Sequence, residues 1–161
     1  MSVIVSHRHE SRLEVLVHAV RMRDALNEFS MRNFGIKNPE QAFRKKHISG
    51  NNKSKTVSKY MVLIGEYGKR IDFLSAQVTG YTRAANTVFP RSPAEFDLRR
   101  EYQDRALVAC EQLVGELQSI AGCFNADLNK YRQYIELIDR EIALIKKWRQ
   151  SDNRLKTALM K

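Results

Sequence analysis

Few side chains in this sequence are grouped in a way that supports catalysis. The chain contains no glycine-rich phosphate-binding loop, no Gly-x-Ser-x-Gly motif and no His-Glu-x-x-His motif. Both cysteines, Cys110 and Cys123, fall in an apolar helical pattern, so we interpret them as reduced thiols packed in a core. The histidines do not supply metal ligands at a recognisable spacing; they are His7, His9, His18 and His47. We therefore expect neither a metal site nor a cofactor.

One pair of residues, Arg12 and His18, has a spacing that is compatible with ribonuclease chemistry. The pair matches the loose arginine-to-histidine pattern of HEPN-type ribonucleases, which are also helical proteins. In those enzymes the motif lies late in the bundle, whereas here it falls on the first predicted helix. A pattern of two residues also arises by chance, and His18 borders an apolar stripe. A ribonuclease is therefore the least favoured interpretation, and we expect a protein that is not an enzyme.

Positive charge is the most informative property of the composition. Lysine and arginine number 28 against 18 aspartates and glutamates, which gives a net charge of +10 and an isoelectric point near 9.8. This excess favours a polyanionic partner, either RNA, DNA or an acidic protein surface. The densest basic segment, Lys37 to Lys59, contains seven bases and a single acid, Glu40. Phe43 and His47 lie within it and could stack on bases; the alternative is a solvated loop that only keeps the protein soluble.

Two groups of basic residues are predicted to contact phosphates. One group belongs to the basic segment, and the other lies near the end of the last predicted helix. The candidate nucleic-acid-binding residues are Arg44, Lys45, Lys46, Lys53, Lys55, Lys59, Lys146, Lys147, Arg149 and Arg154. The second group also suits the negative end of a helix dipole, which is its alternative explanation.

The arginines of the third predicted helix are less suited to binding phosphates. Acidic residues lie three or four positions from them, so ion pairs within one helix are expected to neutralise part of their charge. The predicted pairs are Glu95–Arg99, Asp97–Arg100 and Glu101–Arg105, with Glu136–Arg140 on the fourth helix.

Long helices must position these side chains. Only seven glycines and three prolines occur in 161 residues, which indicates few turns. Apolar residues recur every three or four positions and predict four helices, over residues 11–33, 54–86, 93–121 and 127–148. Ser92 and Glu95 form a capping-box pattern around Pro93, and Asp127 is predicted to cap the last helix.

Each predicted helix carries one apolar stripe. The first consists of Leu13, Leu16, Val17, Val20 and Phe29. The second consists of Tyr60, Leu63, Ile64, Tyr67, Ile71, Leu74, Val78, Tyr81 and Ala85. The third consists of Ala106, Cys110, Leu113, Val114, Leu117 and Ile120, and the fourth of Tyr131, Tyr134, Ile135, Ile138, Ile142, Ile145 and Trp148. Glycines inside the second helix could let another helix approach closely; they are Gly65, Gly68 and Gly80.

The sequence therefore predicts an all-α fold, an antiparallel up-down four-helix bundle with a long basic loop between helices 1 and 2. We expect a single domain over residues 1–161, with a short flexible N-terminus (1–10), the basic loop (about 34–53) and a polar C-terminal tail (about 150–161). No apolar run approaches the roughly 20 residues of a membrane span. The stretch MSVIVSHRHESR lacks the basic region that opens a signal peptide. We expect a cytoplasmic protein with no membrane partner.

Three stretches of the sequence resemble one family of helical bundles. They are AANTVFP, SPAEFDLRREYQDRA and IALIKKWRQSDNR, which lie at the ends and beginnings of predicted helices. They resemble the four-helix-bundle family of intervening-sequence proteins encoded in bacterial large ribosomal RNA genes, and above all the accessory variability determinant of diversity-generating retroelements. The resemblance covers about Lys59 to Arg154. The polar positions that carry it are Asn86, Pro90, Arg99, Gln103, Arg149 and Asp152.

This resemblance implies a homopentameric, barrel-like assembly with a positive surface. In the retroelement branch the assembly binds a dedicated reverse transcriptase and the template-repeat RNA, and it supports mutagenic cDNA synthesis; the ribosomal-insert branch has no established activity. The implied function is a non-enzymatic accessory protein that binds RNA or single-stranded DNA. A module that binds an acidic protein partner is the alternative. Apolar residues off the main stripes are candidates for the subunit contact, or else belong to a wide core stripe; they are Val62, Phe73, Leu128 and Leu137.

Overall fold

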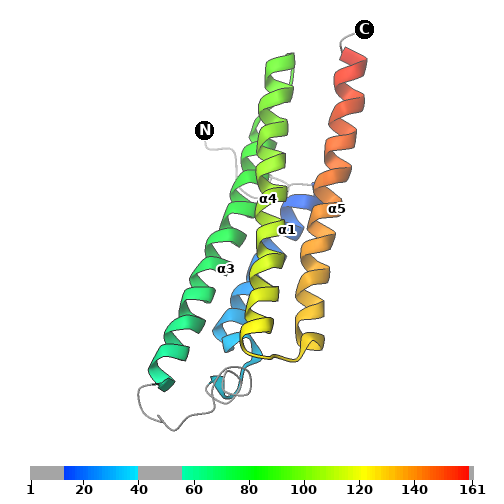
Figure 1. Ribbon diagram of the computed structural model, residues 1–161. Helices are drawn as coiled ribbons and strands as arrows, with labels where there is room; N and C mark the ends of the chain where they lie inside the picture. The colour runs from blue at the N-terminus through cyan, green and yellow to red at the C-terminus, as the bar shows by residue number, and fades with distance from the viewer. Residues whose placement is uncertain (1–12, 40–55, 160–161) are drawn as a thin grey trace, which may run out of the picture.

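The computed structural model describes residues 13–39 and 56–159, and within these ranges the chain forms helices and turns without strands. The elements in chain order are α1 (Glu14–Met31), the 3-10 turn η2 (Asn33–Gly35), α3 (Thr56–Thr87), α4 (Pro93–Cys123) and α5 (Leu128–Leu159). The chain runs down α1, up α3, down α4 and up α5 (Figure 1). This arrangement confirms the predicted all-α, antiparallel four-helix bundle.

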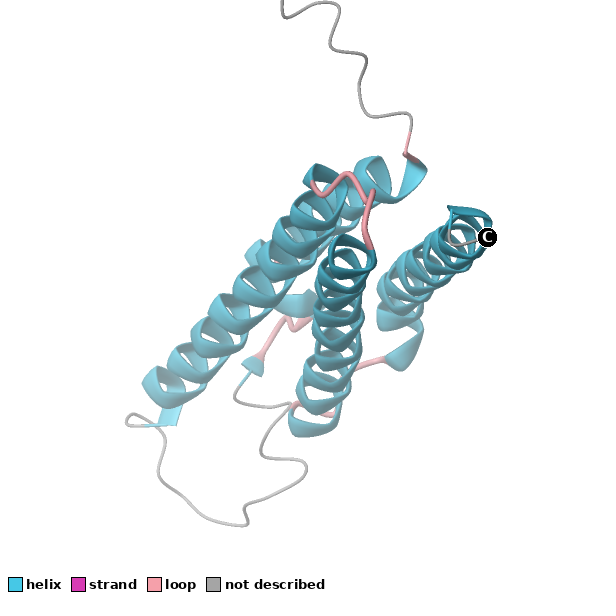
Figure 2. Cartoon of the chain, turned by 90° about the horizontal axis from the view of Figure 1, so that it is seen from above, coloured by secondary structure: helices cyan, strands magenta, loops and turns pink. Residues whose placement is uncertain are grey.

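The four helices surround one core and follow one another around it in sequence order. Packing contacts join α1 to α3, α3 to α4, α4 to α5 and α5 back to α1, so α3 and α5 stand across the bundle from each other. The view from above shows the helices grouped in this way (Figure 2). With 18 residues against 32 in α3, α1 is the shortest helix. The upper parts of α3, α4 and α5 therefore extend beyond it (Figure 1).

The core is formed by the stripes predicted for α3, α4 and α5. Ile71, Leu113, Leu117, Ile138 and Ile145 are fully buried, as their helical spacing indicates. Burying side chains of this size stabilises the bundle by roughly 1.5–3 kcal/mol each.

The stripe predicted for α1 was correct only in part, since Phe29 is buried and Leu13 and Leu16 pack against the core. The buried residues of this helix are Val15, His18, Ala19, Met22, Leu26 and Phe29, whereas Val20 is exposed and Leu16 is half-buried. The helix is turned so that small Ala19 and flexible Met22 face the core, and a histidine shares their face. Apart from Phe29, the predicted stripe followed leucine and valine, and for that reason it missed most of this face.

Aromatic side chains close the lower end of the bundle. The ring of Phe29 packs on Phe34, Tyr131 and Tyr134, with ring centroids 5.5, 5.0 and 3.9 Å away. Phe34 is buried although its backbone has a positive φ of 55°, which is unfavourable for a bulky residue. The Tyr131 hydroxyl donates a hydrogen bond of 3.1 Å to the carbonyl of Phe34. These contacts hold the strained turn in place.

Local sequence signals predicted most helix boundaries correctly. Ser92 and Glu95 form the predicted capping box, in which the Glu95 carboxylate accepts from the Ser92 amide at 2.9 Å. Two backbone amides hydrogen-bonded to this carboxylate lower the pKa of Glu95. Asp127 caps α5 by accepting from the Asn129 amide at 3.0 Å.

The last helix is longer than predicted. Residues 150–159, expected to form a polar tail, continue α5 as regular helix to Leu159. Contacts between α4 and this part of α5, described below, explain the extension. The first helix is shorter than predicted, since it begins at Glu14 and ends at Met31.

Several predictions fall outside the described residues. These are the flexible N-terminus, Arg12, most of the basic loop and the cations Arg44, Lys45, Lys46, Lys53 and Lys55. Within the described ranges, no helix is both long and apolar enough to cross a membrane.

Candidate nucleic-acid interface

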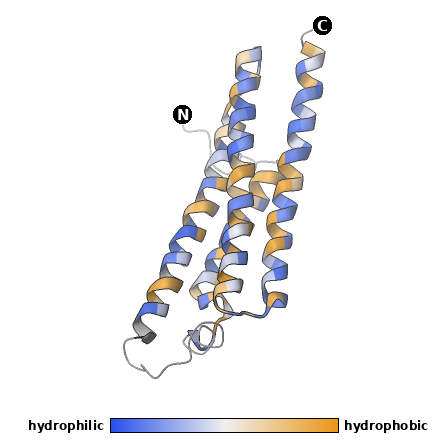
Figure 3. Ribbon diagram, in the orientation of Figure 1, coloured by the Kyte–Doolittle hydropathy of each residue, from blue (hydrophilic) through white to orange (hydrophobic). Residues whose placement is uncertain are grey.

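The outer face of α5 carries a row of exposed basic side chains. Lys146, Lys147 and Arg154 are exposed, and none of the ion pairs of the described residues involves them. Arg140, Lys147 and Arg154 are spaced by seven residues, so they stand about 10 Å apart along one side of the helix. The upper part of α5 is correspondingly hydrophilic (Figure 3). We call Lys146, Lys147 and Arg154 the α5 basic row.

The other described candidates differ from this row. Arg149 lies on α5 beside it, but its guanidinium forms an ion pair of 3.1 Å with Asp104 of α4 and is only 29% exposed. Lys59 is exposed in the first turn of α3. The beginning of α3 and the last turns of α5 lie at opposite ends of the bundle (Figure 1). The structure thus groups the α5 candidates and leaves Lys59 apart from them.

A polar cluster between α4 and α5 holds the basic row in position. It consists of Arg99, Gln103 and Asp104 on α4 with Trp148, Arg149 and Asp152 on α5, and we call it the α4–α5 cluster. Asp152 Oδ2 accepts a hydrogen bond of 2.7 Å from Gln103 Nε2 and lies 3.3 Å from Arg99 Nε.

The guanidinium of Arg99 also lies over the ring of Trp148, 4.7 Å from its centroid. Burial lowers the pKa of Arg99, and the charge of Asp152 opposes this effect. The Arg99–Asp152 pair is largely desolvated, since the two side chains are 14% and 13% exposed. It joins four of the polar positions that carry the family resemblance.

Further contacts continue this connection toward the end of α5. Lys156 Nζ donates to Asp97 at 2.8 Å, and the Arg100 guanidinium donates to the side-chain oxygen of Asn153.

Most of the ion pairs predicted within single helices were therefore wrong. Arg99 and Asp97 pair with α5, Glu95 caps its own helix, and only Glu101–Arg105, at 2.6 Å, forms as predicted.

The fourth predicted pair was wrong for a similar reason. Arg140 pairs with Glu14 of α1 at 2.8 Å rather than with Glu136. This hydrogen bond from Arg140 lowers the pKa of Glu14. Arg140 thus pairs with an acidic residue on a neighbouring helix, and spacing within one helix does not reveal such a partner.

A shallow groove runs along the outer side of α3 and α4. Two adjoining hollows of about 480 and 410 Å³ share Gln112 in their walls. Phe73 and Val108 line these hollows and are 61% and 56% exposed. Of the predicted contact residues, Val62, Phe73 and Leu128 are exposed, whereas Leu137 packs against the core.

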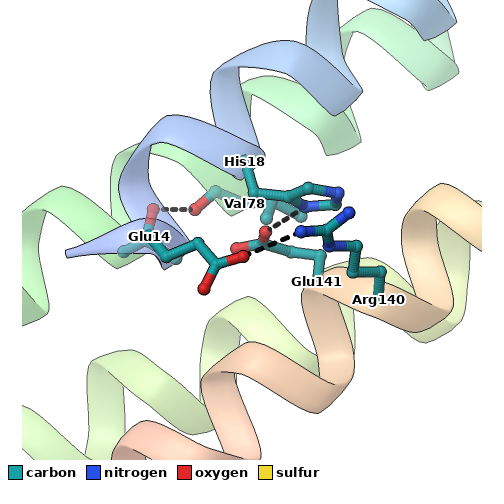
Figure 4. A network of polar contacts seen from close by, with 6 residues as sticks. Glu14, His18, Val78, Arg140 and Glu141 are labelled. Carbon is teal, nitrogen blue, oxygen red and sulfur yellow. Dashed lines mark hydrogen bonds and ion pairs between the residues drawn. The ribbon is translucent and has the colours of Figure 1, made fainter.

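The histidine considered for catalysis lies in the core. His18 Nδ1 is 2.8 Å from Glu141 Oε2 on α5, and the side chains of the two residues are 6% and 0% exposed (Figure 4). A substrate phosphate does not reach His18 in this position. The sequence analysis missed Glu141, although its spacing from Ile138 and Ile145 places it on the buried stripe of α5.

Neither cysteine takes part in a cluster of ligands. Cys110 is fully buried, and burial raises the pKa of its thiol. Among the described residues, no group of three or more histidine, cysteine or acidic side chains could hold a metal ion.

Comparison of the chain with protein-family models, with curated proteins and with solved structures finds no match. The class that the fold defines is an all-α four-helix bundle. Any function must therefore be argued from its surface.

Proposed function

We propose that this chain is a non-enzymatic accessory protein that binds single-stranded nucleic acid, either RNA or cDNA, through the α5 basic row. The observation that supports this most is that Lys146, Lys147 and Arg154 form no ion pair with any other described residue, whereas nearby Arg149 and Lys156 are paired with α4 acids. A cation that is not held in an ion pair is free to replace the counterions of a phosphate chain.

The stiffness of the surface favours binding. A regular helix carries the row, and the α4–α5 cluster fastens that helix to α4 between Lys147 and Arg154. The side chains need less ordering on binding than they would on a fraying tail. The basic loop residues Arg44, Lys45 and Lys46 would add contacts.

The resemblance of the sequence to retroelement accessory proteins extends this proposal to a partner. We infer that the bundle acts together with a reverse transcriptase on its template RNA, as a scaffold that makes and breaks no bond. A homo-oligomer, with a pentamer as the expected form, would multiply the charge of each row. The exposed side chains of the α3–α4 groove, Phe73 and Val108, suit such a contact between copies.

Direct binding tests the proposal. Fluorescence anisotropy with a labelled single-stranded RNA or DNA should show that K146S/K147S/R154S binds on the order of 100-fold more weakly at 0.1 M salt, if all three cations contact phosphates. A matched control removes three cations from α3, by substitution of Lys69, Arg70 and Arg83 with serine. That control should lose far less affinity.

Two outcomes would count against the proposal. Equal losses in the two triple variants would show that net charge alone drives binding. Binding to a polyglutamate chain as tight as to RNA would favour the acidic protein partner. Light scattering of the full chain separately tests the oligomer, and a Phe73→Ser variant should shift it toward the monomer.

A further inference from the structure

A buried polar contact joins α1 to α5. The 2.8 Å contact between His18 Nδ1 and Glu141 Oε2 links the two helices inside the core (Figure 4). The remaining polar atoms of the pair, His18 Nε2 and Glu141 Oε1, are buried and have no hydrogen-bond partner among the described residues. Burial without full hydrogen bonding is costly, so the charge state of this pair bears directly on how tightly α1 packs.

The groups around the pair offer little compensation for a buried charge. On α1, Glu14 and Arg21 face His18 from the surface, and on α5 Arg140 does so while paired with Glu14. On α4 the neighbour of Glu141 is the thiol of Cys110, which stays protonated. On α3 the adjacent carbonyl of Val78 already accepts a hydrogen bond from Thr82 Oγ1 at 2.9 Å.

The pair holds a different number of protons when α1 is docked than when it is released. In water, histidine and glutamate titrate near 6.5 and 4.5, so above pH 6.5 the released side chains together hold no proton. In the core, burial raises the pKa of Glu141 to about 8 and lowers the pKa of His18. The docked pair therefore keeps one proton up to about pH 8, whichever of the two residues carries it.

The direction of the pH effect follows from this difference in the number of bound protons. Between pH 6.5 and 8 the docked form binds the extra proton, so docking weakens as the pH rises through this window. Below pH 6.5 a released His18 binds a proton as well, and the difference disappears. The equilibrium between docked and released α1 should shift roughly tenfold across the window.

We propose that the docking of α1 against α5 is coupled to uptake of one proton by the His18–Glu141 pair, so that α1 is held tightly in mild acid and loosened in mild alkali. The first turn of α1 also lines a hollow of about 220 Å³ with Trp148 and Lys147, so release of α1 would uncover the base of the α5 basic row. The coupling itself does not depend on nucleic-acid binding.

Amide hydrogen exchange of the full chain at pH 6.5 and pH 8 tests this coupling. After correction for intrinsic exchange, the protection of α1 amides should fall about tenfold at the higher pH relative to the amides of α4. Glu141→Gln keeps a hydrogen-bonding side chain but removes the carboxyl titration. It should abolish this step, the fall in α1 protection between the two pH values. Glu14→Gln, at the exposed partner of Arg140, should retain it.

A second variant keeps the test valid if Glu141→Gln does not fold. His18→Leu with Glu141→Leu replaces the pair by apolar side chains, which commonly preserves stability, and should also show no step. The coupling would be refuted if wild-type α1 showed no step, if α4 changed equally, or if Glu141→Gln kept the wild-type step.

Discussion

Asp152 is the residue whose removal should most disturb the surface of α5. Its carboxylate accepts from Gln103 at 2.7 Å and lies 3.3 Å from Arg99, and both partners are on α4. Truncation in Asp152→Ala would leave a buried amide without its acceptor and a largely buried guanidinium without its counter-charge. Gln103 is 1% exposed and the Arg99 side chain 14%, so water replaces the lost contacts poorly.

The expected magnitude follows from these two contacts. A hydrogen bond to a charged group contributes roughly 1.5–3 kcal/mol, and loss of one member of a buried ion pair costs up to about 3–5 kcal/mol. Because the pair is partly solvated, we expect Asp152→Ala to lower the free energy of unfolding by about 2–3 kcal/mol. Asp152→Asn keeps an acceptor for Gln103 but loses the charge, and should fall between wild type and alanine.

Urea denaturation followed by the fluorescence of Trp148 measures this effect, since Trp148 is the single tryptophan and packs on Arg99. Asp97→Ala is the control, because its pair with Lys156 is exposed and should contribute less than about 1 kcal/mol. If Asp152→Ala were no more destabilising than Asp97→Ala, the α4–α5 cluster would not hold α5 in place, and the reasoning would fail.

Other substitutions test the packing of the bundle. Tyr131→Phe removes only the hydroxyl that hydrogen-bonds the Phe34 carbonyl, and should lower the unfolding free energy by about 1–3 kcal/mol, with no loss in Tyr134→Phe. Gly68→Ala should be less favourable in thermal unfolding than Gly65→Ala, because an added Cβ would stand 2.7 Å from Ser30 Oγ on α1 and would force that side chain to move. Gly65→Ala meets no atom within 4 Å and should stabilise α3 by up to about 1 kcal/mol. Equal effects of the two glycine substitutions would contradict the close approach of α1 at Gly68.

The bundle itself could be predicted because its signals are local. Stripes such as Ile138, Ile142 and Ile145 recur at helical spacing, and the Ser92–Glu95 capping box marks the start of α4 in four residues of sequence. Boundaries supported by tertiary contacts could not be predicted in this way. Residues 150–159 have little apolar character, and they remain helical alongside partners on α4 such as Asp97 and Arg100.

The charged surface was harder to predict, because sequence spacing favours partners within one helix. Arg99 and Arg140 both lie four residues from an acid, yet each pairs with a different helix. Arg149 was assigned to phosphates because Asp104, far away in the sequence, could not be seen to lie beside it. Glu141 was overlooked because the predicted stripe of the last helix included apolar and aromatic residues only.

The central claim, that Lys146, Lys147 and Arg154 of the α5 basic row bind a phosphate chain, is tested most directly by the salt dependence of binding. For single-stranded nucleic acid, each phosphate contact adds about 0.7 to the slope of log K against log salt concentration. The K146S/K147S/R154S variant should therefore bind with a slope about 2 units shallower than wild type, while the α3 triple variant keeps the wild-type slope. Identical slopes for wild type and the α5 variant would contradict the account.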